Sequence, residues 1–482
     1  MKLSELLHHK VVDDVDILGL CNDSRRIQSG DLFIAYPGAV ADGRKYFAQV
    51  QHAAAVLYEP QNFPKTAQLP THIPCIAVDS LVDKLAHFAA HFYGNPAQSL
   101  SITGVTGTNG KTTIAYQLAQ AYAMLGSASS YIGTLGHGSV DSLQPLGNTT
   151  PDALCLQKLL AQDKAAGVER VCMEVSSHAL SQNRVGDIPF EQGIYTNLSH
   201  EHLDYHHTMD AYAQAKAQLF ATEGLQTAVI NFDDAYSAIM EKNLPASCQV
   251  IRYGMQDACD VQALHWRASI GGTEVAVRTP WGVFDFQLKA VGEFNVYNAL
   301  AVFASLATSA IAPVETIAKL ISKLHASPGR MEIVNQQPCI IVDYAHTPDA
   351  LANVLKTLQS LKPHKLWVVF GCGGDRDTAK RPTMGSIASE YADYIIVTND
   401  NPRTESPSLI ADAIVQGIPQ AKAQVILDRK SAIHYALERA EKEDIVVVAG
   451  KGHEDYQILG EEKIYFSDKE IIQFFYRKTG SF

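Results

Sequence analysis

The stretch ITGVTGTNGKTTIAYQLAQAYAMLG, residues 102–126, decides the expected class of fold because it joins a strand pattern to a helix pattern through a glycine-rich loop. The strand is rich in β-branched residues, and the helical pattern that Lys111 opens stops at Gly126. Such a loop turns its backbone N–H groups around phosphates, while Lys111 reaches the β- and γ-phosphates and the Thr112 hydroxyl binds Mg²⁺. A strict Walker motif would have glycine in place of Val105. We therefore predict an ATP-binding loop of unusual spacing.

Length, composition and charge limit the class of protein. The 482 residues are too many for one core, and 46% hydrophobic with 19% charged residues is typical of a globular protein. A net charge of −12 argues against non-specific nucleic-acid binding. No apolar run has the roughly 18 residues of a membrane span, and the start lacks the apolar region of a signal peptide. The eight cysteines are scattered without a CxxC pair. We predict a cytoplasmic protein that binds neither nucleic acid nor membranes.

Two breaks in the pattern divide the chain into three α/β domains. The breaks are HFYGNPAQSL, residues 91–100, and HASPGRMEIV, residues 325–334. Short strands and turns precede the first break, and strand and helix patterns alternate after each of the two, which favours parallel sheets. The predicted domains are residues 1–95, 96–327 and 328–482.

Four polar residues of the central region bear on its chemistry. Glu174 ends the apolar run RVCMEV, at the carboxyl end of a predicted strand, and its oxygens suit Mg²⁺. In SHEHLDYHH, His202 and His206 have the spacing of a zinc site, but no cysteine or further clustered carboxylate completes one. Lys216 lies in the amphipathic pattern AYAQAKAQLF, where a lysine is normally solvated.

The third region brings two arginines and a glutamate to the ends of strands. FGCGGDRD, VTNDNPR and VAGKGHE each follow an apolar run, so a parallel sheet would place Arg376, Arg403 and Glu454 at one edge. Pro402 stiffens the loop where Arg403 leaves it. Taken alone, DNPR could be a solvated turn. Two guanidinium groups and a carboxylate would suit a zwitterionic amino acid that carries an extra carboxylate.

Nine motifs in order resemble the muramyl-peptide (Mur) ligases and their folylpolyglutamate synthetase relatives over essentially the whole chain. The motifs are GTNGKTT (107–113), NTTPD (148–152), MEVSSHAL (173–180), TNLSHEHLDYH (196–206), AYAQAKAQLF (211–220), GEFNVYNALAV (292–302), SPGRME (327–332), DYAHTPDAL (343–351) and AGKGHEDYQ (449–457). Together with DNPR, they are most similar to the branch that adds meso-diaminopimelate to a UDP-muramyl dipeptide in peptidoglycan precursor synthesis.

The resemblance implies an ADP-forming amide ligase with three domains. These are an N-terminal UDP-binding α/β domain, a central P-loop ATPase-like parallel-sheet domain and a C-terminal Rossmann-like domain. ATP would phosphorylate the glutamyl carboxylate of the UDP-muramyl dipeptide, and the amine of diaminopimelate would attack the acyl phosphate. Positioning and charge neutralisation would carry most of the catalysis. The resemblance also implies a monomer.

The resemblance assigns the nucleotide and metal contacts residue by residue. The catalytic residues would be Lys111, Lys216, His202 and Glu174. Two Mg²⁺ ions would be held by Thr112, Glu174, His202 and Lys216, with Lys216 carbamylated by CO₂. The ATP contacts would be Gly107, Thr108, Asn109, Gly110, Lys111, Thr112, Thr113, Asn295, Arg330 and Asp343, with Asn298 as a helical neighbour. His206 and His207 would be surface or supporting residues.

The two other substrates would use separate residue sets. The UDP-muramyl contacts would be Asn22, Ser24, Ala39, Val40, Ala41, Asn148, Thr149, Thr150, Ser176, Gln182 and Arg184. Because Ala39 and Val40 replace polar residues of the family, contacts there would come from the backbone. The diaminopimelate contacts would be Arg376, Asp400, Asn401, Pro402, Arg403, Gly450 and Glu454. Arg403 would bind the distal carboxylate, which lysine lacks, and the lysine-adding branch lacks this arginine.

Two other interpretations remain open at this point. The chain could be a lysine-adding, another Mur-type or a folylpolyglutamate ligase, which would share the ATP loop but lack DNPR and this N-terminal region. It could also be a P-loop protein that binds ATP without forming an amide.

Overall fold

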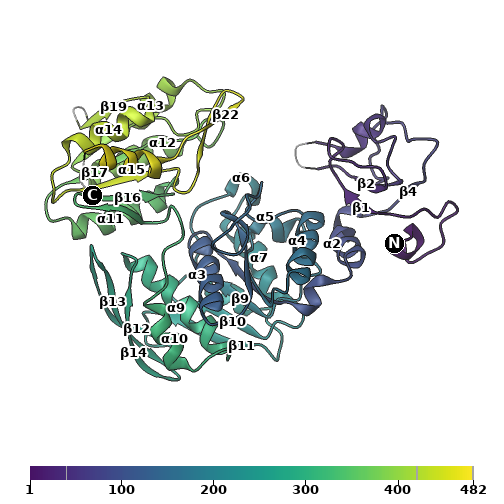
Figure 1. Ribbon diagram of the computed structural model, residues 1–482, viewed down its shortest axis with the longest axis horizontal. Helices are drawn as coiled ribbons and strands as arrows, with labels where there is room; N and C mark the ends of the chain where they lie inside the picture. Colours follow the sequence, from purple (N-terminus) through teal and green to yellow (C-terminus); the bar gives the residue numbers. More distant parts are fainter. Residues whose placement is uncertain (39–40, 420–421, 480–482) are drawn as a thin grey trace.

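The computed structural model describes residues 1–38, 41–419 and 422–479. Sheets of four, ten and six strands follow one another along the chain, and a two-stranded hairpin lies near its end. Figure 1 shows each large sheet in its own body, with the purple N-terminal and yellow C-terminal bodies on opposite sides of the central one. The predicted α/β fold with three domains is confirmed. Within the described residues, no helix combines the length and apolarity needed to cross a membrane.

The N-terminal sheet is parallel throughout, with its strands in chain order. The elements of this body are α1 (Leu3–Leu7), β1 (Gly19–Cys21), β2 (Asp31–Ala35), β3 (Ala55–Tyr58), β4 (Cys75–Ala77) and α2 (Leu81–Phe92). Leu81, Leu85 and Phe88 recur at helical spacing, and they bury one face of α2 in the core of this body. Helix α2 also contacts α4 (Ala153–Ala165) of the central body.

The central sheet has a parallel core, in which β5 (Ser101–Thr106) lies between β8 and β9. Its other elements are α3 (Lys111–Met124), β6 (Ser129–Gly133), β7 (Gly136–Gly138), α4, β8 (Arg170–Glu174), α5 (Ser177–Ser181), β9 (Gln192–Tyr195), α6 (Leu203–His206), α7 (Met209–Ala217), β10 (Thr227–Asn231), α8 (Ser237–Glu241), β11 (Gln249–Gly254), β12 (Val261–Ser269), β13 (Gly272–Thr279), β14 (Gly282–Leu288), α9 (Glu293–Thr308) and α10 (Val314–Ile321). The sheet order is β14-β13-β12-β11-β10-β9-β5-β8-β6-β7.

Both edges of this sheet are antiparallel, which the sequence did not predict. Strands β12, β13 and β14 pair antiparallel, as do β6 and β7. Short turns at residues 270–271 and 280–281 join the outer strands, and connections this short permit only antiparallel pairing.

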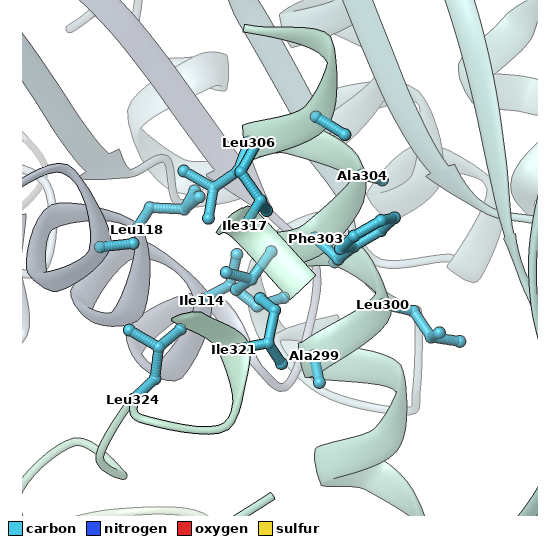
Figure 2. Close-up of a cluster of buried hydrophobic side chains, with 14 of the residues drawn as sticks. Ile114, Leu118, Ala299, Leu300, Phe303, Ala304, Leu306, Ile317, Ile321 and Leu324 are labelled. Carbon is cyan, nitrogen blue, oxygen red and sulfur yellow. The ribbon is translucent and has the colours of Figure 1, made fainter. Parts of the chain in front are cut away.

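Helix α3 is buried on most of its surface because it lies between the central sheet and helices α9 and α10. Figure 2 shows Ile114 and Leu118 of α3 gathered with Leu306, Ile317 and Ile321. Each such side chain, fully buried, contributes about 1.5–3 kcal/mol to stability. This packing fixes the start of α3, and therefore the glycine-rich loop that precedes it.

The C-terminal sheet has the order β15-β16-β20-β17-β18-β19. The elements of this body are β15 (Glu332–Gln336), β16 (Cys339–Asp343), α11 (Pro348–Leu361), β17 (Leu366–Phe370), α12 (Lys380–Tyr391), β18 (Tyr394–Val397), α13 (Pro407–Val415), β19 (Ala423–Val425), α14 (Arg429–Arg439), β20 (Ile445–Ala449), β21 (Tyr456–Leu459), β22 (Glu462–Tyr465) and α15 (Asp468–Thr479). All pairs except β15–β16 are parallel. The ends of β17, β18 and β20 therefore share one edge, as the sequence predicted.

Candidate active site

The glycine-rich loop at the end of β5 has a compact, glycine-dependent shape. Gly107 and Gly110 have positive φ values of 148° and 89°, and a Cβ on Gly107 would lie 1.8 Å from Thr196 Oγ1. Lys111 Nζ donates to the carbonyls of Gly107 and Thr108, each at 2.8 Å. Burial lowers the pKa of Lys111. The loop therefore brings a poorly hydrated amine to the N-terminus of α3, where a helix favours anions.

Neighbouring segments hold the loop in place. The Asn109 N–H donates to Asn197 Oδ1 at 3.0 Å, and Thr196 Oγ1 donates to the Asn109 carbonyl at 2.6 Å. On α3, Thr113 Oγ1 lies 3.4 Å from Ser327 Oγ, in the segment that leads to the C-terminal body. The predicted phosphate loop is thus tied both to its own sheet and to the interdomain segment.

Glu174 is 1% exposed and pairs with Val105, so its carboxylate lies directly beside the start of the loop. Its Oε2 accepts from Thr112 Oγ1 at 2.9 Å, and its Oε1 accepts from the Tyr131 hydroxyl and, at 2.8 Å, from the Thr134 N–H. The structure thus brings together the two oxygen ligands that were predicted for one Mg²⁺.

This donor set fits Mg²⁺ better than it fits a zinc ion. None of the described side chains form a group of three or more His, Cys, Asp or Glu residues placed to hold a metal. Mg²⁺ needs no such cage, because proteins commonly bind it through one or two carboxylates together with substrate phosphates. Thr112 and Glu174 beside a phosphate loop meet that requirement.

Lys216 is buried, in contrast to the solvated position that its amphipathic helix suggested. It is 1% exposed because α7 packs its lysine face against the phosphate loop. Its Nζ donates to the Gly107 carbonyl at 2.7 Å and lies 4.4 Å from the centre of the Tyr212 ring. Burial and the charge of Lys111 hold the pKa of Lys216 well below its ordinary value. Burial therefore shifts Lys216 towards its neutral form.

The histidines form an aromatic cluster beside this amine. His202 precedes α6 in a left-handed conformation and lies edge-on to His178, with ring centroids 4.9 Å apart. His206 is buried, stacks on Tyr212 at 4.9 Å and has its Nε2 2.9 Å from Ser177 Oγ. Burial lowers the pKa of His206 to about 4. His206 is therefore a packed supporting residue, whereas His207 is exposed.

A small cleft lies beside α3, and Asn295 is one of the residues that line it. Asn295 Nδ2 donates to the Val291 carbonyl at 2.8 Å, and its Oδ1 accepts from Asn298 Nδ2 at 3.2 Å. Figure 2 shows three of the lining residues, Ala299, Ile321 and Leu324, close to α3. The full lining is Gln117, Leu288, Lys289, Ala290, Asn295, Ala299, Ile321 and Leu324. Polar and apolar atoms line this cleft about equally, and in this conformation it is too small for a heterocycle.

The interdomain segment places Arg330 and Asp343 side by side. The Arg330 guanidinium lies 4.4 Å from the centre of the Tyr344 ring. Both carboxylate oxygens of Asp343 accept backbone N–H groups, from Met331 and Ala345, at 2.7 Å. Burial raises the pKa of Asp343, and the charge of Arg330 opposes that rise. In this conformation Asp343 orders the segment itself.

The residues predicted to contact the muramyl peptide form two groups. In the first, Asn22 Nδ2 donates to the Tyr36 hydroxyl at 3.1 Å and Ser24 Oγ donates to Gln49 Oε1 at 2.7 Å. The Ala41 carbonyl accepts from the Gly38 N–H at 2.9 Å. The predicted contacts at Ala39 and Val40 lie outside the described residues.

The second group lies at the end of β8. Thr150 Oγ1 donates to the Glu174 carbonyl at 2.9 Å and accepts from the Ser176 N–H at 3.0 Å. Arg184 donates through Nη1 to the Thr150 carbonyl and through Nε and Nη2 to Gln182 Oε1. Nearby, Thr149 Oγ1 lies 3.1 Å from Thr134 Oγ1, while Asn148 is exposed. Four predicted residues therefore form one hydrogen-bonded group beside Glu174.

The Arg403 guanidinium and the aliphatic part of the Arg376 side chain both lie beside Gly373. A Cβ on Gly373 would lie 3.1 Å from Arg403 Nη1 and 3.8 Å from Arg376 Cγ. Arg403 has a φ of 51°, and its Nη1 donates to the Gly374 carbonyl at 2.7 Å. Its backbone is held by the hairpin β21–β22, through bonds to the Ile458 carbonyl and the Gly460 N–H. Arg376 is exposed.

Asn401 links the other predicted residues of this edge. Its Oδ1 accepts from Lys451 Nζ at 3.3 Å and from the Ile458 N–H at 3.0 Å, and its Nδ2 donates to Glu454 Oε2 at 3.0 Å. Lys451 also donates to Glu454 Oε2 at 2.9 Å. The Asp400 carboxylate lies against Gly450, where a Cβ would be 2.6 Å from Oδ2. Pro402 is buried beside them.

Four residues of the site were missed from the sequence. Tyr131 and Thr134 donate hydrogen bonds to the Glu174 carboxylate. Tyr131 lies in the strand SSYIG and Thr134 directly follows it, and apart from hydroxyl groups this stretch has no polar side chain that would indicate a site. Tyr212 lies one helical turn before Lys216, and this i, i+4 spacing could have revealed it. Lys451 is a cation between two glycines directly after an apolar strand, which is a recognisable signal.

Comparison with protein families identifies the same regions. Residues 105–306 match the model "Mur ligase middle domain", and residues 329–452 match "Mur ligase, glutamate ligase domain". These two matches cover the glycine-rich loop, Glu174, Lys216 and both arginines.

Individual relatives match along nearly the whole chain. A UDP-N-acetylmuramoyl-L-alanyl-D-glutamate–2,6-diaminopimelate ligase from Coxiella burnetii is 43% identical over 481 residues, covering 97% of this chain and 98% of the relative. One of the same name from Chromobacterium violaceum is 42% identical over 459 residues, covering 94% and 92%. A solved structure with this name superposes with a TM-score of 0.71 at 34% identity, covering 100% of this chain and 99% of that one.

Proposed function

The chain belongs to the Mur ligase family, and on that premise we propose that it adds meso-diaminopimelate to UDP-N-acetylmuramoyl-L-alanyl-D-glutamate with cleavage of ATP to ADP. The observation that carries this proposal is the placement of the Arg403 guanidinium and the Arg376 side chain beside the same residue, Gly373, in a chain that is 43% identical to a relative named for that activity over 97% of its length. The reaction serves peptidoglycan precursor synthesis.

We divide the work among three domains, residues 1–95, 96–327 and 328–482. The first holds the uridine diphosphate end of the muramyl substrate, with Asn22, Ser24 and the segment 39–41. The second activates the substrate, and the third presents the amino acid. We also propose that the protein acts as a cytoplasmic monomer.

The phosphate loop residues 107–113 hold the ATP phosphates through backbone N–H groups and Lys111. We assign Asn295 to the adenine, and Arg330 and Asp343 to the rest of the nucleotide. The glutamyl carboxylate attacks the γ-phosphate, which releases ADP and gives an acyl phosphate. The amine of diaminopimelate then attacks the acyl carbon, and phosphate leaves as the amide forms. Lys111 and Arg330 offset the charge that gathers on the transferred phosphoryl group.

The metal ligands of the proposal are few and have donor atoms that suit Mg²⁺. Thr112 and Glu174 would hold one Mg²⁺, and His202 with a carbamylated Lys216 would hold a second. When bound, Mg²⁺ neutralises phosphate charge. CO₂ reacts with the neutral form of an amine, and burial shifts Lys216 towards that form. Carbamylation releases a proton and leaves an anion, which can bind Mg²⁺, where the protonated lysine would repel it.

The peptide end of the muramyl substrate lies at the group beside Glu174. We assign its contacts to Asn148, Thr149, Thr150, Ser176, Gln182 and Arg184. Because Thr150 is bonded to the Glu174 carbonyl, this group would deliver the substrate carboxylate next to the phosphate loop.

The amino acid lies at the carboxyl edge of the C-terminal sheet. Arg403 binds its distal carboxylate with Arg376 beside it, and Asp400 and Glu454 take the ammonium group near Gly450. Lysine has no carboxylate at its distal end, so Arg403 would have no group to bind there. A site built to bind a charged group rejects analogues without it, because its own buried groups would be left unpaired.

The test is release of ADP and phosphate by the purified protein. We expect both products in equal amounts, and only when muramyl dipeptide, diaminopimelate and ATP are all present. Lys111→Ala should abolish release, while Lys158→Ala, on the exposed face of α4, should leave it unchanged. ATP cleavage that needs neither substrate would instead identify a P-loop protein that forms no amide, and preference for lysine would identify the lysine-adding branch.

A further inference from the structure

Arg429 is completely buried, and its charge is paired with the equally buried Asp468. Its Nε and Nη2 donate to the two carboxylate oxygens at 2.8 and 2.7 Å. The remaining donors reach backbone: Nη1 binds the Asn399 carbonyl at 3.1 Å and Nη2 binds the Ala449 carbonyl at 2.9 Å. One guanidinium therefore joins helix α15 to two strand ends.

Stability alone does not account for this ion pair. A buried pair can commonly be replaced by apolar residues of similar volume without loss of stability, because desolvation offsets the attraction. Arg429 is also the first residue of α14, where the helix dipole disfavours a cation. What the arginine provides, and an apolar residue could not, is a rigid set of donors for two backbone carbonyls.

The two carbonyls lie directly behind the proposed amino-acid site. Asn399 precedes Asp400, and Ala449 precedes Gly450. Strands β18 and β20, which lead to these residues, flank β17, so the guanidinium spans the strand that leads to Arg376. Burial alone would lower the pKa of Arg429, but the carboxylates of Asp468, Asp400 and Glu454 raise it. Arg429 is thus charged and within electrostatic reach of the site.

We propose that Arg429 is a positioning residue for the amino-acid substrate, which fixes the spacing between the loop at residues 400–403 and the loop at residues 450–454. This inference rests on the proposed function, because it takes those loops to bind the amino acid. If the spacing changes, the carboxylate and the ammonium group of diaminopimelate can no longer reach Arg403 and Glu454 together.

The decisive variant is the double substitution Arg429→Met with Asp468→Asn, which removes the donors without leaving a buried charge unpaired. We expect its KM for diaminopimelate to rise about 10- to 100-fold, since misplacement by 1 Å can cost that much. Its preference for diaminopimelate over lysine should fall in parallel, while the KM values for ATP and muramyl dipeptide stay unchanged. Arg439→Met, at the exposed end of the same helix, is the matched control and should behave as the wild type.

Two outcomes would overturn the inference. One is a double variant whose melting temperature, KM for diaminopimelate and preference for diaminopimelate over lysine all equal those of the wild type. The other is an equal rise of all three KM values, which would indicate general loosening. If the double variant does not fold, Arg429→Lys decides by the same criteria, because lysine keeps the charge but cannot bind both carbonyls and Asp468.

A separate variant distinguishes failure of the inference from failure of the proposed function. Arg403→Ala should raise the KM for diaminopimelate if these loops bind the amino acid. If Arg403→Ala has no effect, the proposed site itself is wrong. If only the Arg429 variants have no effect, the site stands and Arg429 does not position it.

Discussion

Two lysine amines share one backbone carbonyl in the central body. Lys111 Nζ and Lys216 Nζ lie 2.8 and 2.7 Å from the Gly107 oxygen, and both side chains are withdrawn from bulk water. Lys216 is fully buried and Lys111 half-buried, and two positive charges so close together are unfavourable. Burial and the charge of Lys111 therefore hold the pKa of Lys216 well below its ordinary value. A neutral amine is the form that reacts with CO₂.

Lys216→Ala should therefore remove the proposed carbamate and with it most of the activity. We expect phosphate release to fall by about 100-fold or more, as when one charged group of a catalytic site is lost. Added short-chain carboxylates, or the variant Lys216→Glu, should restore part of the rate. The exposed Lys242 provides the control, Lys242→Ala. Full activity of Lys216→Ala without any added carboxylate would show that no carbamate on Lys216 is needed.

The carboxylate of Glu174 leads to a second prediction at this scale. Because the Tyr131 hydroxyl and the Thr134 N–H orient it, Tyr131→Phe should raise the Mg²⁺ concentration needed for half-maximal activity by about 10-fold or more. Tyr116→Phe changes a neighbouring tyrosine on α3 and should leave that concentration unaltered. If wild type and Tyr131→Phe need the same Mg²⁺ concentration, the Tyr131 hydroxyl does not orient Glu174 for metal binding.

At the scale of elements, the segment from Ser327 to Met331 joins the central body to the C-terminal one and contacts both. Asp343 binds the Met331 N–H, and Ser327 lies near Thr113 of α3. Gly329 passes so close to residues 452–453 that a Cβ would lie 2.1 Å from the His453 nitrogen. The segment is therefore packed between the phosphate loop helix and the loop that carries Glu454.

Gly329→Ala should disturb this contact without unfolding either body. Its φ of 68° and the 2.1 Å approach to backbone both oppose a side chain, so we expect kcat to fall about tenfold or more through misplacement of the C-terminal body. Gly224→Ala has a similar φ of 82° but open space around it, and it should affect only stability, by about 1–2 kcal/mol. Equal kcat values for the two variants would count against a role for the segment.

The sequence predicts elements well where their patterns are local. Continuous apolar runs identified β8, β17, β18 and β20, and the residues after them lie at the predicted sheet edges. The antiparallel strands β12–β14 were not predicted, although the turn signals IGG (270–272) and PWG (280–282) separate them. The burial of Lys216 was not predicted either, since packing against the phosphate loop decides which face of α7 is buried. The local sequence pattern therefore predicts whether a segment is a helix or a strand, whereas the burial of its side chains depends on contacts with other elements.

For the molecule as a whole, the two halves of the proposed reaction lie in different bodies. The phosphate loop and Glu174 belong to the central sheet, and Arg403 belongs to the C-terminal sheet. The two bodies face each other: burial lowers the pKa of His346 in the C-terminal body, and the charge of Glu201 in the central body opposes that change. The acyl phosphate and its amine must therefore meet across this boundary, with the interdomain segment as the joint.

The central claim is that Arg403 recognises the distal carboxylate of the incoming amino acid. The most direct measurement is phosphate release with diaminopimelate and with lysine, for the wild type and Arg403→Ala, with the exposed Arg278→Ala as control. We predict that the wild type and Arg278→Ala prefer diaminopimelate by about 10³- to 10⁴-fold in kcat/KM, and that Arg403→Ala loses most of this preference while still binding ATP. An unchanged preference in Arg403→Ala would contradict the account.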